Sequence, residues 1–210
     1  MQTVRVSILF FDEVEVLDVC GPFEVFSVAA RVARRADRDR PPVFVVSTVA
    51  VGATTTVLAR GGLPITTAYT LDTAPEADIV LVPGGVTRAV EADEALIAWL
   101  RARSATTPTI ASVCTGALVL ATAGLLDGRT ATTHWEDLDE LRTRFPSVQV
   151  DPDARYIDHG DIATSAGVSA GIDLALHLVA RFATPELASS TARQMDYPWA
   201  GEAANAGRTD

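Results

Sequence analysis

The stretch of residues 109–120 constrains the fold most strongly, because a strand pattern and a helix pattern meet in it at a cysteine. Residues 109–113 are β-branched or small, as a buried strand requires, and residues 115–120 are small and then apolar, as a tightly packed helix requires. Cys114 at the junction must turn sharply, which places its sulfur beside the amides of the following helix. That position favours a thiolate and hence a reactive cysteine. A buried cysteine acting as a small hydrophobic side chain is an equally good interpretation.

The composition of the 210 residues indicates one domain with one core. Hydrophobic residues make up 48%, so we expect a single domain over residues 1–200 and a disordered polar tail at 201–210. The net charge is −10, and the arginine-rich segment 31–40 is interleaved with alanine and aspartate, which argues against nucleic acid as a partner. Cys20 and Cys114 are too few for a disulfide framework, which favours the reducing cytoplasm.

The N-terminus predicts no membrane span, and the histidines predict no metal site. The apolar run of residues 1–11 is too short to span a bilayer, and acidic residues follow it at once with no cleavage site, so we expect no membrane contact. His134, His159 and His177 are scattered without metal-ligand spacing, so we expect no metal. His159 is expected in a hairpin turn and His177 on a helix face.

Strands and helices alternate along the chain, which predicts a three-layer α/β/α sandwich with a mainly parallel, flavodoxin-like sheet. We expect strands at residues 1–11, 43–49, 51–58 (a strand or part of a hairpin), 78–82, 109–113, 129–132, 148–150, 155–158 and 162–164. We expect helices from Gly21-Pro22 to about 35, over 93–105, after Cys114, up to about 145, up to about 182, and over 185–195.

Two further positions follow strands and can meet Cys114 at the sheet edge. Asp18 precedes the expected helix start at Pro22; it is a capping carboxylate or, with apolar neighbours on both sides, a partly buried one. Strand 78–82 closes on a Pro-Gly-Gly sequence that ends at Gly85, which either offers bare amides to a developing negative charge or forms a tight turn. Ligands of such folds bind at the carboxyl ends of the strands.

Five motifs resemble those of the ThiJ/PfpI superfamily, the class I glutamine amidotransferase-like group, over nearly the whole chain. They are LDVCGP at 17–22, VPGG at 82–85, SVCTGA at 112–117, ATTHW at 131–135 and AGVSAGID at 166–173. Within the superfamily the chain is most similar to isonitrile hydratases and to the N-terminal domains of AraC-type transcriptional regulators. The regulators continue into helix-turn-helix motifs, whereas this sequence ends at Asp210, so we expect no DNA binding by this chain.

The resemblance implies specific site residues. Cys114 is the nucleophile on an elbow between strand and helix, Asp18 is the carboxylate beside it, and the amides of Gly85 and Thr115 are oxyanion donors. Thr115 stands where PfpI-type proteases carry a histidine, so proteolysis is not expected. The remaining implied pocket residues are Cys20, Gly84, His134 and Val168, although a structural histidine that holds a loop is the favoured interpretation of His134.

The activity implied by the resemblance is hydration of isonitriles to N-substituted formamides. Cys114 would attack the isonitrile carbon, and Asp18 would protonate the substrate and later activate water, without a cofactor. One alternative is a ligand-sensing module without turnover, and another is glyoxalase-like or deglycase-like chemistry on reactive carbonyls. The expected partners are a small-molecule substrate and, as is common in this superfamily, a second copy of the chain.

Overall fold

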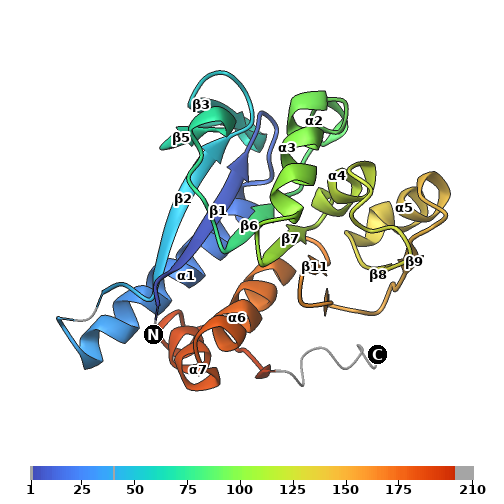
Figure 1. Cartoon of the computed structure of the whole chain (residues 1–210). Helices are drawn as coiled ribbons and strands as arrows, with labels where there is room; N and C mark the ends of the chain where they lie inside the picture. Colours follow the sequence, from blue (N-terminus) through green and yellow to red (C-terminus); the bar gives the residue numbers. More distant parts are fainter. Residues whose placement is uncertain (1, 40, 202–210) are drawn as a thin grey trace.

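A seven-stranded sheet forms the middle layer of the computed structural model, which describes residues 2–39 and 41–201 (Figure 1). Apart from Gly201, the tail expected at 201–210 lies outside the described residues. The strands lie in the order β10 (Tyr156–Asp158), β11 (Ile162–Ser165), β7 (Thr109–Val113), β6 (Ile79–Val82), β1 (Val4–Phe10), β2 (Phe44–Ala50) and β5 (Tyr69–Thr70). All neighbours pair in parallel except β10, which is antiparallel to β11.

Helices cover both faces of this sheet, which confirms the expected three-layer α/β/α arrangement (Figure 1). One group packs together on one side and consists of α1 (Val16–Ala36), α6 (Ala170–Phe182) and α7 (Pro185–Gln194). The other group consists of α2 (Arg88–Glu91), α3 (Glu94–Ser104), α4 (Gly116–Thr122) and α5 (Leu138–Arg144). Because both faces are covered, β6 and β7 are buried at every position, as their continuous apolar sequences require.

Short elements extend the fold beyond the sheet. The hairpin of β3 (Thr56–Ala59) and β4 (Leu63–Thr66) turns through a 3₁₀ segment, η1 (Arg60–Gly62), in which both glycines have positive φ. β8 (Thr130–Ala131) pairs in parallel with β9 (Gln149–Val150). Two further 3₁₀ segments are η2 (Leu71–Thr73) and η3 (Trp135–Asp137). Of the segment 51–58, expected as a strand or part of a hairpin, residues 56–58 belong to this hairpin and residues 51–55 form bends instead of a strand.

The start of α1 differs from the sequence prediction. The helix begins at Val16, so Pro22 lies inside it rather than in its first turn, and Asp18 and Cys20, which precede the expected start, are part of the helix. The ring of Pro22 removes one backbone hydrogen bond, at a cost of about 3 kcal/mol. The apolar face of the helix outweighs this cost because Val19 and Phe26 are fully buried.

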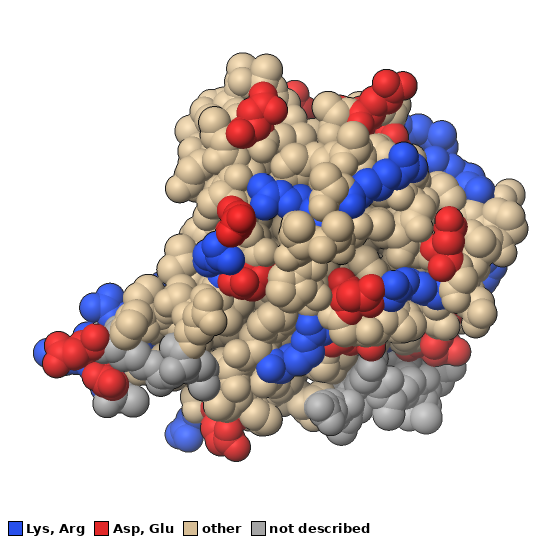
Figure 2. Space-filling model, viewed as in Figure 1, with Lys and Arg blue, Asp and Glu red and all other residues tan. Residues whose placement is uncertain are grey.

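Charged side chains are interspersed on the face that Figure 2 shows. Arginine and acidic residues alternate over that surface, without a continuous band of one sign. No helix among the described residues has the length and apolarity to cross a membrane.

Candidate active site at the carboxyl edge of the sheet

Cys114 occupies the sharp turn that the sequence predicts between β7 and α4. Its φ of 57° lies in the left-handed region, which is unusual for a residue with a side chain. Two contacts hold this conformation: the Cys114 amide donates to Ser165 O at 3.1 Å, and Thr133 Oγ1 donates to the Cys114 carbonyl at 2.8 Å. Gly116 has no side chain to obstruct the turn, since a Cβ there would lie 2.2 Å from Val82 O.

Asp18 reaches the same place from the first turn of α1. Its side chain is fully buried, and its Oδ2 accepts the Gly84 amide at 2.9 Å. Its Oδ1 has no partner within hydrogen-bond geometry among the described residues. A Cβ on Gly84 would lie 2.8 Å from Asp18 Oδ2 and 2.6 Å from Thr115 Oγ1, so the loop after β6 must carry a glycine here for the carboxylate to fit.

Burial raises the pKa of both Asp18 and Cys114. For Asp18, burial and the nearby charge of Glu15 raise the pKa to about 7, against the Gly84 amide, which lowers it by hydrogen bonding. Burial, and then the Asp18 charge, raise the pKa of Cys114 to about 12. The predicted preference of Cys114 for a thiolate is therefore wrong for the free protein, because burial and Asp18 outweigh the amides beside the sulfur.

The amides that face the Cys114 sulfur come from two loops. Thr115 and Val168 donate to it through their backbones and lower the pKa of the thiol. Val168 has a φ of 47°, which a β-branched residue seldom adopts, and this conformation aims its amide at the sulfur. The Gly85 amide is engaged elsewhere, since it donates to Thr115 Oγ1 at 2.9 Å.

A cavity of about 200 Å³ opens in front of Cys114. Five residues singled out from the sequence line it, namely Gly85, Cys114, Thr115, His134 and Val168. Gly84 and Asp18 lie behind this wall, and Cys20 is exposed on α1 outside it. Four lining residues were missed by sequence reasoning, namely Glu15, Arg60, Glu136 and Asp137.

His134 both lines the cavity and holds a loop. Its Nδ1 accepts the Glu136 amide at 3.4 Å and so caps η3, while its ring packs against Gly167, where a Cβ would lie 2.0 Å from the ring. The other two histidines bind structural partners, His159 the Thr130 carbonyl and His177 the Asp158 carboxylate. In the described part of the chain, no three His, Cys, Asp or Glu side chains are arranged to hold a metal ion.

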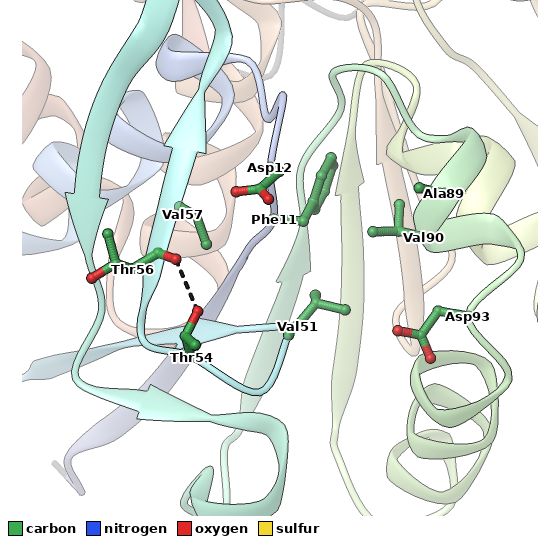
Figure 3. Close-up of a pocket in the computed structure, with 10 residues that line it drawn as sticks. Phe11, Asp12, Val51, Thr54, Thr56, Val57, Ala89, Val90 and Asp93 are labelled. Carbon is green, nitrogen blue, oxygen red and sulfur yellow. Dashed lines mark hydrogen bonds between the residues drawn. The ribbon is translucent and has the colours of Figure 1, made fainter.

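A second cavity of about 210 Å³ lies between the β3–β4 hairpin and the helices α2 and α3 (Figure 3). Its two carboxylates have structural roles: Asp12 accepts the Leu58 amide at 2.8 Å, and Asp93 caps α3 through two amides. Thr54 donates to the Thr56 carbonyl across its lower edge (Figure 3). The residues that line this cavity include no thiol, so we assign the chemistry to the cavity at Cys114.

Known proteins resemble this chain over most of its length. The DJ-1/PfpI family matches residues 4–181. An isonitrile hydratase from Pseudomonas putida is 32% identical over 196 residues, which cover 92% of this chain and 78% of that protein. The HTH-type transcriptional regulator CdhR from Pseudomonas aeruginosa is 38% identical over 138 residues, 66% of this chain but only 41% of that protein.

A solved structure supports the same relationship. A ThiJ/PfpI family protein from Pseudomonas syringae superposes with a TM-score of 0.81 at 29% identity, covering 94% of this chain and 76% of that one. The resemblance predicted from the five sequence motifs, to both hydratases and regulators, is confirmed.

Proposed function

This chain belongs to the DJ-1/PfpI family, and on that premise we propose that it hydrates isonitriles to N-substituted formamides, with Cys114 as nucleophile and Asp18 as acid and base. The observation that carries the proposal is a buried carboxyl group beside a buried thiol at a cavity wall. The 32% identity to an isonitrile hydratase over 92% of the chain supports the choice of substrate.

In the first step, the sulfur of Cys114 bonds to the terminal carbon of R–N≡C. The thiol proton passes through Asp18 to that same carbon, which gives the thioimidate R–N=CH–S–Cys114. The Thr115 and Val168 amides stabilise charge on the sulfur while the proton moves. The high pKa of the free thiol fits this order, because Cys114 loses its proton only as the bond to carbon forms.

In the second step, water adds to the thioimidate carbon. Asp18 takes a proton from the water and the substrate nitrogen gains one; the C–S bond then breaks, which restores the thiol and releases R–NH–CHO. The pKa of Asp18, about 7, suits a group that must both give and accept a proton near neutral pH. Water and the isonitrile supply every atom of the product.

Formamide production from a small neutral isonitrile tests this proposal. Purified protein with neohexyl isonitrile should release the formamide, detected by NMR. Cys114→Ala should abolish release, whereas Cys20→Ala, the same change at an exposed position outside the cavity, should retain it. Absence of turnover by the wild type across several small isonitriles would contradict the proposal.

A ligand-sensing role is the second candidate, favoured by the 38% identity to a transcriptional regulator. The same cavity would then bind a small molecule without turnover. Saturable binding of an isonitrile without formamide release would favour this role over catalysis.

We also propose a second copy of the chain as a partner. The exposed side chains of Leu17 and Phe23 on α1, each 38% exposed, lie on the helix that carries Asp18. Sedimentation of the wild type should give a dimer, and Phe23→Asp should shift it toward the monomer.

A further inference from the structure

We propose that the cavity at Cys114 selects ligands that carry a positively charged group. This inference deepens the proposed function, on which it rests for the identity of the reacting group, by naming the substrates as isonitriles with a cationic substituent. It derives from the four lining residues that lie outside the five family motifs, namely Glu15, Arg60, Glu136 and Asp137.

The charges around the cavity do not balance. Arg60 Nη1 lies 3.5 Å from Glu15 Oε2, so these two side chains offset each other. Glu136 and Asp137 have no arginine partner among the described residues that line the cavity. Their ion-pair contact is His134 Nδ1, at 3.7 Å from Glu136 and 3.4 Å from Asp137.

His134 does not balance this excess. One imidazole ring can offset at most one of the two carboxylates that it contacts. The cavity wall then holds three carboxylates against Arg60 and His134. At least one negative charge in excess therefore faces the space in front of the sulfur.

Glu136 and Asp137 lie at different depths. The Asp137 side chain is 27% exposed and its charge reaches the reacting atom, since it raises the pKa of the Cys114 thiol. The Glu136 side chain is 63% exposed and lies toward solvent. A substituent that extends outward from an isonitrile carbon at Cys114 would pass Asp137 and then Glu136.

The wall offers little to a purely apolar substituent. Val168 is the one fully aliphatic side chain among the lining residues, and the others are charged, polar or glycine apart from the thiol of Cys114 itself. A cation in this space would gain Coulomb attraction from both carboxylates and would also offset the repulsion of the forming thiolate by Asp137. Charge rather than apolar contact therefore distinguishes ligands here.

Charged thiol reagents test the inference without any turnover. The rate of Cys114 modification is measured by peptide mass for cationic trimethylammonioethyl methanethiosulfonate and for anionic sulfonatoethyl methanethiosulfonate. Each rate is divided by the rate of the same reagent with a free small thiol. We expect the normalised ratio to favour the cation by about tenfold at low salt. A ratio near one, or one that favours the anion, would overturn the inference.

Matched variants assign the preference to these carboxylates. The double variant Glu136→Gln/Asp137→Asn should bring the ratio close to one. Glu186→Gln removes an exposed carboxylate in α7, away from the cavity, and should leave the ratio unchanged. In wild-type protein, about 1 M salt should also collapse the ratio, which tests the claim even if the double variant folds poorly. A preference that survives both treatments would contradict the assignment.

Isosteric substrates then separate this inference from the proposed function. Trimethylammonioethyl isonitrile and neohexyl isonitrile differ in charge but hardly in shape, and kcat/KM should favour the cation by about tenfold. Turnover of both at equal kcat/KM would overturn the charge preference and leave the hydratase proposal intact. A cation preference in thiol modification without turnover of either isonitrile would overturn the hydratase proposal and leave the charge preference intact.

Discussion

Asp18 and Asp158 are both shielded from solvent, Asp18 near the carboxyl ends of the parallel strands and Asp158 near their amino ends. The groups that surround the two carboxylates differ completely. The Asp158 side chain is 12% exposed and lies 2.7 Å from His177 Nε2. Its two oxygens also accept from Arg181 Nη1, at 2.7 and 2.6 Å, and Oδ1 accepts the Gly160 amide. These partners hold its pKa well below its ordinary value. Asp18 is fully buried with one amide partner and no cation, and burial raises its pKa.

The difference separates a structural carboxylate from a reactive one. Asp158 is charged at neutral pH because Arg181, His177 and the Gly160 amide replace the water it has lost, and it thereby ties β10 to α6. Asp18 lacks such replacement, so its charged and neutral forms are nearly equal in free energy at neutral pH. Burial of the Asp18 carboxyl group without a cation therefore lowers the stability of the fold, and a structural role for Asp18 does not explain this loss.

The largest expected change in stability is at Asp158. Asp158→Asn removes the countercharge of Arg181 and one hydrogen-bond partner of His177, and should lower the free energy of unfolding by about 3 kcal/mol at neutral pH. Because the pKa of Asp158 is depressed, this stabilisation is present above the unfolded pKa and is lost as the pH falls. Urea unfolding at about pH 7 and at about pH 3, below the ordinary pKa of 3.8, measures it, and an equal loss at both would contradict this account.

The expected change at Asp18 has the opposite sign. Its folded-state pKa, about 7, exceeds the ordinary 3.8, so the wild type loses stability as the pH rises through that interval. Asp18→Asn has no charge to bury and should be more stable than the wild type by about 2 kcal/mol at pH 8. This difference in unfolding free energy should be smaller at about pH 5. A difference that does not change with pH would contradict the raised pKa of Asp18.

The smallest expected change is at a carboxylate that is paired but exposed. Asp161 binds Arg129 through two hydrogen bonds of 2.7 Å, yet its side chain is 59% exposed. Asp161→Asn should therefore cost less than about 1 kcal/mol, and added salt should reduce even that. A loss as large as that of Asp158→Asn would show that pairing with an arginine, rather than burial of the pair, determines how much a carboxylate contributes to stability.

The sequence predicted the parts of this molecule that depend on local pattern. Apolar runs located β6 and β7, and the strand-to-helix change at Cys114 located the turn. It failed at the start of α1, because the local preference of Pro22 for a helix start is overridden by burial of the helix face. Tertiary packing decides such a case, and one sequence does not display it.

The electrostatics of the site could not be predicted from the sequence. The pKa of Cys114 depends on burial and on Asp18, which lies far from it along the chain. The positive φ of Val168 could not be predicted either, because a β-branched residue seldom adopts it. Glu136 and Asp137 could have been found, since they follow almost directly after His134 in a motif already expected at the pocket.

The turnover of Asp18→Asn tests the central claim most directly. The variant keeps a similar shape and an oxygen for the Gly84 amide but cannot exchange a proton. We expect formamide production to fall at least about a hundredfold, while Cys114 remains open to alkylation and thermal melts show a folded protein. Asp161→Asn, the same substitution at an exposed site, should keep wild-type turnover. Hydration by Asp18→Asn at the wild-type rate would show that the proton comes from another group and would contradict the role of Asp18 as acid and base.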